Sequence, residues 1–259
     1  LWPLSRASAP KQFIQFVGDK TLFQGTLARV GDPVLYEKPI VITNDDFRFL
    51  AAEQAREIGV KLTAILLEPV ARNTAAAVAA AATFVAQTFG EEAILQILAS
   101  DHEIVAEQDY RSAIQVAQAA AASGKLVTFG IAPTEPATGY GYIEIGEELP
   151  SGACKVARFV EKPALPEAQR MLSAGGYVWN AGIFMFQAAQ VLQEMGLHAP
   201  DVKRAAGAAV SKAVSDLDFI RLDENEFAAS PDISVDYALM EKTASAAVVP
   251  ATFTWSDMG

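Results

Sequence analysis

Short apolar runs alternate along this chain with segments of helical periodicity, and this alternation constrains the fold more than any other feature. In the first half, apolar runs that end abruptly lie at 39–45, 61–69, 92–101 and 125–133. Between them, apolar residues recur at helical spacing over 45–59, 74–90 and 108–124. A strand–helix–strand rhythm of this kind predicts an α/β fold, with a mainly parallel sheet covered by helices on both faces.

Beyond Pro133 the pattern changes to shorter apolar segments. Strands are expected at 141–149, 154–163 and 179–187, helices near 187–213, and a final strand at 246–257. We expect this second half to fold onto the same sheet as the first. No internal repeat, low-complexity tail or flexible linker divides the sequence, which therefore predicts a single domain, 1–259, made of the halves 1–133 and 134–259.

The composition excludes several classes of function. Acidic residues outnumber basic residues by 31 to 20, and the net charge of -11 argues against nucleic acid, which a basic groove would bind. The most apolar helical segment, 74–90, is built from alanine and interrupted by polar residues, so it predicts no membrane span. Cys154 is the single cysteine, and His102 and His198 lie far apart, so the sequence offers neither a disulfide within the chain nor a zinc-ligand spacing. A cytoplasmic protein without a membrane partner is expected.

Two aspartates follow apolar runs that we expect to be strands. Asp101 ends the run "ILQILASD", and Asp257 ends "VVPATFTWSD". In open α/β sheets, ligands bind outside the carboxyl ends of the strands, where two such carboxylates could hold Mg²⁺ against the phosphates of a substrate. For each aspartate alone, the alternative is a helix N-cap or a turn residue. His102, the next residue, could orient the loop that carries Asp101.

The segment "FVEKP" places two opposite charges at the end of an expected strand. Glu161 and Lys162 point to opposite faces unless Pro163 turns the chain there. The carboxylate could then reach a sugar hydroxyl, while the ammonium meets a phosphate as a point charge. The alternative is a surface ion pair.

Two further segments combine glycine with polar side chains. Gly139 and Gly141 flank Tyr140 in "TGYGYIE", and this spacing lets backbone amides approach a ligand closely, although a tight turn explains it equally well. Asn180 in "WNAGIF" could bond sugar hydroxyls, or it could only pin a bend. The tryptophans Trp179 and Trp255 are expected in the core.

The segment "EPVARNTAAA" joins a strand end to the start of the alanine-rich helix. It carries Glu68, Arg72, Asn73 and Thr74. Helix N-termini suit anions, and a carboxylate accepts the N1–H and N2–H₂ donors of guanine, which adenine lacks, so Glu68 could select a base. A plain N-cap accounts for Asn73 and Thr74 and gives no reason for Glu68 and Arg72.

With these pieces in order, the chain resembles the sugar-1-phosphate nucleotidyltransferases, and among them the bacterial mannose-1-phosphate guanylyltransferases that are often fused to a phosphomannose isomerase. The motifs occur in the family's order: "LWPLSR", "PKQF", "EPVARNTAAA", "ASDH", "TGYGYIE", "FVEKP", "WNAGIF", "DLDFIRLD", "SVDYALMEK" and "WSDMG". The resemblance spans nearly the whole chain. It implies a Rossmann-like, mainly parallel mixed sheet with helices on both faces, as in the GT-A-like fold of nucleotide-diphospho-sugar transferases.

The resemblance also implies a reaction, in which GTP and mannose 1-phosphate give GDP-mannose and pyrophosphate with Mg²⁺. It assigns the metal to Asp101 and Asp257, the triphosphate to Lys11, the mannose to Glu161 and Asn180, and the sugar phosphate to Lys162. It places Gly139 and Gly141 on the sugar side of the cleft, and Glu68, Arg72 and Asn73 on the nucleotide side. The halves 1–133 and 134–259 would then bind nucleotide and sugar phosphate respectively.

The chain departs from the family pattern at three places. Ala99 stands where proline usually precedes "SDH". The glycine-rich run and arginine that normally precede "LWPLSR", and any domain after "WSDMG", are not in this sequence, so we expect the native protein to extend past both ends. The resemblance is compatible with a homodimer. The alternatives in function are a related transferase for another nucleotide or hexose 1-phosphate, and a non-catalytic nucleotide-sugar sensor on the same fold.

Overall fold

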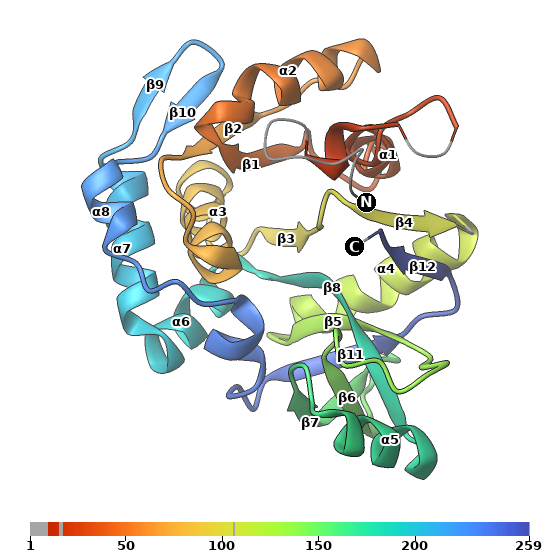
Figure 1. The fold of residues 1–259 in the computed structure, drawn as a ribbon. Helices are drawn as coiled ribbons and strands as arrows, with labels where there is room; N and C mark the ends of the chain where they lie inside the picture. The colour runs from red at the N-terminus through yellow and green to blue at the C-terminus, as the bar shows by residue number, and fades with distance from the viewer. Residues whose placement is uncertain (1–9, 16–17, 106, 259) are drawn as a thin grey trace.

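The computed structural model describes residues 10–15, 18–105 and 107–258 (Figure 1). The strands are β1 (Ile40–Asn44), β2 (Ala64–Glu68), β3 (Ile94–Ile97), β4 (His102–Val105), β5 (Leu126–Ile131), β6 (Tyr142–Glu148), β7 (Cys154–Val160), β8 (Tyr177–Gln187), β9 (Val214–Asp216), β10 (Phe219–Arg221), β11 (Ala246–Pro250) and β12 (Thr254–Asp257). The α-helices are α1 (Leu22–Arg29), α2 (Arg48–Glu57), α3 (Asn73–Phe89), α4 (Glu107–Ala122), α5 (Leu165–Ala174), α6 (Ala188–His198), α7 (Pro200–Ser211) and α8 (Glu224–Ala228). Shorter turns are the 3₁₀ helices η1 (Lys11–Phe13) and η2 (Asp45–Phe47) and the π-helix η3 (Asp236–Met240). Among the described residues, no helix has the length and apolar character that a membrane crossing needs.

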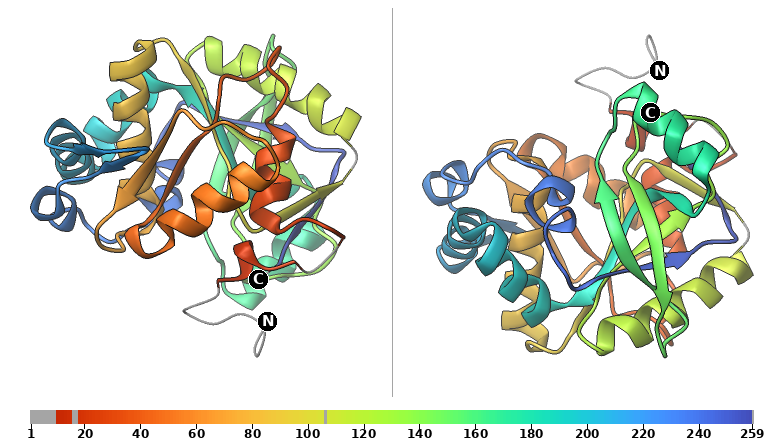
Figure 2. Two further views of the ribbon diagram at one scale, coloured as in Figure 1. Left: turned by 90° about the horizontal axis from the view of Figure 1, so that it is seen from above. Right: turned by 90° about the horizontal axis from the view of Figure 1, so that it is seen from below.

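The strands form more than one sheet, which corrects the expectation of a single sheet, although strands of both halves do lie side by side. A four-stranded sheet has the order β1-β2-β10-β9, and a six-stranded sheet has the order β3-β8-β5-β11-β7-β6, with β8 also paired to β6. Each of these sheets takes strands from both halves of the chain. Figure 2 shows the β9–β10 hairpin and the β6–β7 pair on opposite sides of the molecule.

The α/β architecture is confirmed, but the expectation of a mainly parallel sheet is wrong. The pairings β1–β2, β2–β10 and β5–β11 are parallel, and the other seven among the described residues are antiparallel. The antiparallel pairs arise mostly after residue 133, where β6 and β7 are joined by the short connection 149–153. Parallel neighbours need a crossover of a dozen residues or more, and this connection is too short for one.

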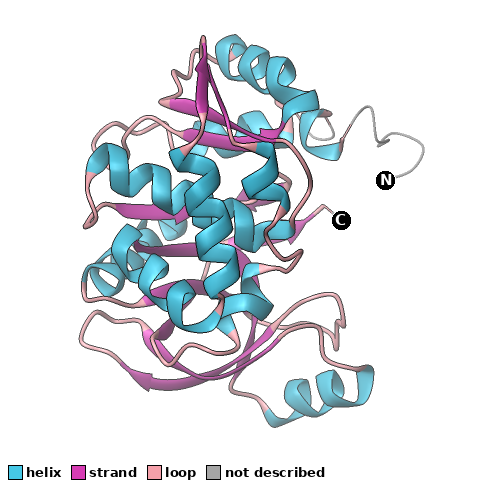
Figure 3. Ribbon diagram, turned by 90° about the vertical axis from the view of Figure 1, so that its left-hand side faces the viewer, coloured by secondary structure: helices cyan, strands magenta, loops and turns pink. Residues whose placement is uncertain are grey.

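Helices cover both faces of the six-stranded sheet, as the sequence predicts. Along β5, Val127 and Phe129 pack with α4, while Leu126 packs into the core shared with α3, α6 and α7. The same alternation recurs in β11, where Val249 joins the first cluster and Val248 the second. Side chains of a strand alternate between its two faces, so apolar runs such as these must be covered on both. Figure 3 shows the α3, α6 and α7 side, with helices in front of the strands.

The final apolar run, 246–257, forms two strands rather than the one expected. β11 ends at Pro250, which has no amide hydrogen to continue the ladder, and the chain turns through 251–253. Phe253 anchors this turn, with its ring 5.3 Å from the ring of Tyr110. β12 then leaves the main sheet and pairs with β4, and the register places Asp257 opposite His102.

A buried carboxylate fixes the connection that leads into β11. Glu194 on α6 is 7% exposed and accepts hydrogen bonds from Thr243 Oγ1 at 2.6 Å and Ser245 Oγ at 3.0 Å. These two residues lie between η3 and β11, so Glu194 ties α6 to the segment that joins both elements. A charged acceptor with satisfied partners contributes more to stability than a neutral one.

Glu194→Ala should lower the free energy of unfolding by about 2–3 kcal/mol, because two half-buried hydroxyl groups lose their acceptor and the buried site of Glu194 is left empty. Urea denaturation measures this change. The exposed Glu92 is the matched control, and Glu92→Ala should change the free energy by less than about 0.5 kcal/mol. Equal effects of the two substitutions would contradict the role given to Glu194.

Candidate functional site

Three charged residues from distant parts of the chain meet at one point. Lys11 lies in η1, Asp101 in the turn between β3 and β4, and Asp257 at the end of β12. The ammonium nitrogen of Lys11 is 2.9 Å from Asp101 Oδ2 and 3.4 Å from Asp257 Oδ1. Burial works to lower the pKa of Lys11, but the hydrogen bonds and charges of the two aspartates raise that pKa above its usual value. The lysine therefore stays charged between two carboxylates.

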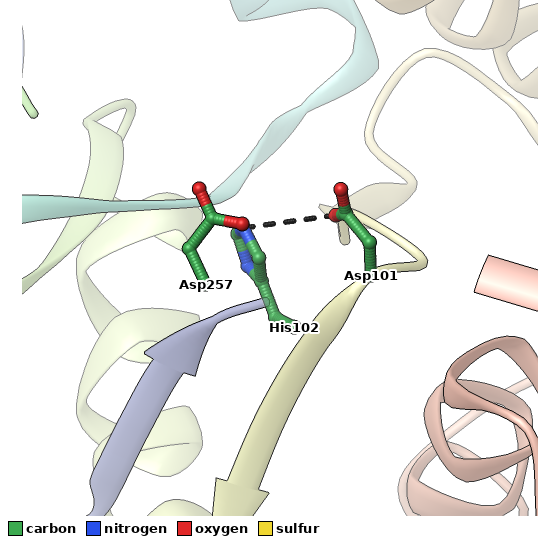
Figure 4. A group of neighbouring side chains, drawn as sticks. All are labelled: Asp101, His102 and Asp257. Carbon is green, nitrogen blue, oxygen red and sulfur yellow. Dashed lines mark ion pairs between the residues drawn. The ribbon is translucent and has the colours of Figure 1, made fainter. Parts of the chain in front are cut away.

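The pairing of β4 with β12 brings the two aspartates together. The antiparallel register sets Asp257 against His102, so Asp101, one residue earlier, lies beside it. Figure 4 shows the two carboxylates turned toward each other, with His102 next to them. Potential ligand atoms of Asp101, His102 and Asp257 lie within 4.8 Å of one another, close enough to hold a metal ion.

His102 is 9% exposed, and its contacts define its role. Trp255 Nε1 donates a hydrogen bond to His102 Nδ1 at 3.3 Å, and the two rings pack edge to face. Burial is the largest influence on the pKa of His102 and lowers it, so the ring is neutral. Because Nδ1 accepts from Trp255, the single proton is on Nε2, which lies 3.9 Å from Asp101 Oδ1. A protonated nitrogen cannot bind a metal, so the two carboxylates are the candidate ligands, and His102 lies beside Asp101 at a distance too long for a hydrogen bond. Trp255, expected in the core, is half-buried: it packs against the core cluster on the α4 side and holds His102 through its ring nitrogen.

A small cavity of about 130 Å³ opens beside the aspartates. The sequence-predicted residues that line it are Gly139, Gly141, Glu161, Lys162, Asn180 and Asp257. A larger cavity of about 470 Å³ lies between α1 and β4, and His102 is the one residue singled out from the sequence that lines it. Convergent charged and amide groups make the smaller cavity the candidate ligand site.

Glu161 lines this cavity with a buried carboxyl group whose pKa is raised. Its side chain is 8% exposed, and Oε2 is buried without a hydrogen-bond partner among the described residues. A Cβ atom at position 141 would lie 2.5 Å from that oxygen, so Gly141 is required for the carboxyl group to fit. Burial, and then the charge of Asp236, raises the pKa of Glu161 to about 7.

Lys162 turns the chain after β7. Its φ of 47° lies in the left-handed region, which few residues other than glycine adopt. This turn brings its ammonium to 3.6 Å from Glu161 Oε1, whereas an extended chain would separate the two side chains. The Lys162 side chain is 57% exposed, so its charge is free to meet an anion entering from solvent.

Hydrogen bonds to both the oxygen and the nitrogen of its side-chain amide fix the orientation of Asn180. Its Oδ1 accepts hydrogen bonds from Thr128 Oγ1 at 2.6 Å and from the Gly182 amide, while Nδ2 donates to Asp236 Oδ1 at 2.8 Å. The second hydrogen of Nδ2 remains for a ligand. Asp236, which no sequence pattern singles out, also lines the cavity, from the first turn of η3. A short π-helix leaves no distinctive periodicity in the sequence. The family motif "SVDYALMEK", which contains Asp236, was therefore the only sequence feature that could have pointed to it.

The residues expected to face a nucleotide lie outside this cavity. Glu68 ends β2, and burial raises its pKa to about 7. Arg72 donates from Nε and Nη2 to the carbonyl of Ala228, at 3.0 and 2.8 Å, so its guanidinium is committed to a backbone contact with α8. Asn73 is exposed, has a φ of 60°, and accepts a hydrogen bond from the Thr74 amide. The residues 1–9, which include all of "LWPLSR", lie outside the described part of the chain.

The nucleotidyl transferase family matches this chain over residues 1–259. The chain is 58% identical to the mannose-1-phosphate guanylyltransferase of Sinorhizobium fredii, 50% to the xanthan biosynthesis protein XanB of Xanthomonas campestris and 47% to the mannose-1-phosphate guanylyltransferase of Escherichia coli. These alignments cover all of this chain but 51%, 55% and 55% of the three relatives, so the chain spans about half their length.

Solved structures show the same fold. A protein from Helicobacter pylori described as mannose-6-phosphate isomerase matches with a TM-score of 0.86 at 33% identity, over 97% of this chain and 96% of that one. A protein from Thermus thermophilus described as mannose-1-phosphate geranyltransferase matches with a TM-score of 0.85 at 34% identity, over 99% of this chain and 72% of that one. These matches confirm the nucleotidyltransferase fold expected from the sequence.

The buried carboxyl group of Glu161 predicts a pH-dependent stability. Its pKa rises from 4.5 in the unfolded chain to about 7 in the fold, so the stability that it contributes is fully present below pH 4.5 and is lost as the pH rises through about 7. Glu161→Gln should therefore gain stability relative to the wild type between about pH 5 and pH 8, by at most about 3 kcal/mol. Urea unfolding at both pH values measures this gain. A difference that does not change with pH would show that Glu161 ionises normally.

Proposed function

We propose, from the premise that this chain belongs to the nucleotidyl transferase family, that it forms GDP-mannose and pyrophosphate from GTP and mannose 1-phosphate. The observation that carries the proposal is the placement of Lys11 between Asp101 and Asp257, next to the cavity lined by Glu161 and Lys162. The cluster of one ammonium and two carboxylate groups suits a metal-bound triphosphate. The hydrogen-bonding groups of the neighbouring cavity suit the hydroxyl groups of a sugar. The names of the relatives support the choice of guanine and mannose.

The cavity would receive the mannose 1-phosphate. Glu161 and Asp236 can accept hydrogen bonds from sugar hydroxyls, and Asn180 can donate one through its remaining Nδ2 hydrogen. Gly139 and Gly141 also line this cavity, and the absence of side chains there keeps its walls open to the sugar ring. The exposed ammonium of Lys162 would bind the phosphate at the mouth of the cavity.

The reaction needs no general base from the protein. A phosphate monoester has a second pKa near 6, so it is largely a dianion at neutral pH. One of its oxygens forms a bond to the α-phosphorus of GTP, and the bond from that phosphorus to the bridging oxygen of the β-phosphate breaks, so that pyrophosphate leaves. Lys11 would stabilise the charge that grows on the leaving group.

Asp101 and Asp257 would hold a divalent cation, which we propose to be Mg²⁺. Two carboxylates with ligand atoms in reach of each other match the one or two carboxylates with which proteins bind this ion beside substrate phosphates. When bound, Mg²⁺ supplies positive charge to the triphosphate oxygens. His102, held by Trp255, would lie next to this cation site.

Glu68, Arg72 and Asn73 would lie on the nucleotide side, with Glu68 as the base selector. Burial raises the pKa of Glu68 to about 7, and the ionised form of this carboxyl group at the end of β2 would accept both donors of the guanine edge. The contact of Arg72 with Ala228 suggests that this arginine shapes the nucleotide side by fixing the loop before α3. The single, half-buried Cys154 is in keeping with work in the reducing cytoplasm.

Base and sugar choice test this proposal. Pyrophosphate release by the purified protein should require mannose 1-phosphate and should be at least about tenfold faster with GTP than with ATP or UTP, because only guanine satisfies a carboxylate with two donors. A coupled assay for pyrophosphate measures the rates. Equal rates with the three nucleotides would refute the guanylyltransferase assignment, and release with glucose 1-phosphate at the same rate would refute the choice of mannose.

A further inference from the structure

Lys11 lies in a turn of three residues that is not stable without contacts from other elements. η1 spans Lys11–Phe13, has Pro10 as its N-cap and receives no side-chain cap there. Its internal support is limited to the hydrogen bonds from the Phe13 and Ile14 amides to the carbonyls of Pro10 and Lys11. So short a 3₁₀ segment is only marginally stable. The ammonium of Lys11 can stay between the two aspartates only if other elements hold this turn.

Contacts of Phe13 tie η1 to the rest of the molecule, among them the packing of its ring against Phe47 of η2, with centroids 5.9 Å apart. The ring of Phe13 packs edge to face against Phe23 of α1, with centroids 5.3 Å apart. The carbonyl of Phe13 accepts a hydrogen bond from Gln54 Nε2 of α2 at 3.0 Å. The aromatic contact restrains the ring, and the hydrogen bond restrains the backbone from which Lys11 projects.

The side chain of Gln54 cannot turn round to break this bond. Its Oε1 accepts from the hydroxyl of Thr21 at 2.7 Å, and that hydroxyl in turn accepts from the backbone amide of Gln24 at 3.1 Å. The carbonyl of Phe13 can only accept, so the nitrogen of the Gln54 amide must face Phe13 and its oxygen then receives the one proton of the Thr21 hydroxyl. All three polar side chains are buried, at 6%, 4% and 7% exposed for Thr21, Gln24 and Gln54.

The backbone of Gln54 is held as well. Gln24 Nε2 donates to the Gln54 carbonyl at 3.2 Å and to Glu57 Oε2 at 2.8 Å, and Gln24 Oε1 accepts from the Thr21 amide. The network thus joins the N-terminus of α1, the middle of α2 and the carbonyl of η1. Buried networks in which every member is satisfied favour one arrangement, because a rotated amide would leave several groups unpaired.

We propose that Gln54 is a positioning residue, which holds η1 through the Phe13 carbonyl and thereby places the ammonium of Lys11 between Asp101 and Asp257. Gln54 itself lies outside the cavity and outside the three-charge cluster, and it acts only through Lys11. Its expected effect on triphosphate binding rests on the proposed function, whereas its effect on the position of Lys11 does not.

The structural test is a crystal structure of Gln54→Met. Methionine matches the length of glutamine and removes both hydrogen bonds, so Lys11 Nζ should leave hydrogen-bonding distance of Asp101 while α1 and α2 keep their places. Gln54→Glu is the second variant: it retains the acceptor for Thr21 and removes only the donor to Phe13, so it should displace Lys11 too. If Lys11 Nζ stays within about 3 Å of Asp101 in both variants, the proposal is overturned.

The kinetic test separates positioning from general loss of structure. Gln54→Met should raise the KM for GTP roughly three- to tenfold, the size expected when the displaced Lys11 loses one hydrogen bond to the triphosphate. The KM for mannose 1-phosphate should stay unchanged. In a Lys11→Met background the same substitution should have no further effect on the KM for GTP. Gln190→Met, which removes a half-buried amide on α6 far from η1, is the matched control and should change neither KM.

The outcomes distinguish the two proposals. A rise in both KM values, or an equal rise with and without Lys11, would overturn the role of Gln54. If the wild type releases no pyrophosphate with GTP and mannose 1-phosphate, the proposed function fails, and the crystal structures alone still decide whether Gln54 positions Lys11.

Discussion

The ammonium of Lys11 between the carboxylates of Asp101 and Asp257 is the interaction on which the rest of the site depends. Two carboxylates this close repel each other unless a cation lies between or beside them. The cation comes from residue 11 and the carboxylates from residues 101 and 257, so three separate arrangements must hold at once. The β4–β12 register supplies the aspartates, and η1, held from α2, supplies the lysine.

The cavity beside this cluster follows the same physical logic. Glu161 and Asn180 point into it with orientations already set by burial and by hydrogen bonds, so a ligand would meet groups that need little rearrangement. The cost is visible in Glu161, whose pKa near 7 reflects an acid kept away from water. Such perturbed groups are typical of functional sites, where stability is exchanged for readiness to bind.

The local sequence pattern predicts much of this fold. The remainder depends on which segments far apart in the sequence pair with each other, and local pattern does not show this. The helices over 45–59, 74–90 and 108–124 and the strands between them follow from apolar periodicity, and the strand-end position of Asp101 follows with them. The antiparallel arrangement after residue 133 does not, because strand direction is decided by which distant segments meet. For the same reason the break within 246–257, and the pairing that carries Asp257 to Asp101, could not be read locally. The roles of Asp236 and Gln54 were hidden too, because an isolated polar residue reveals its partners only in the folded chain.

Metal binding by the two aspartates tests the central claim most directly. Mn²⁺, a paramagnetic substitute for Mg²⁺, can be titrated into the purified protein, with free ion counted by electron paramagnetic resonance. Asp101→Asn and Asp257→Asn should each weaken binding at least about tenfold, since each removes one of two charged ligands. Lys11→Met should not weaken it, because the carboxylates would no longer be shared with an ammonium group. Unchanged affinity in both aspartate variants would contradict the claim that these residues form the metal and triphosphate end of the site.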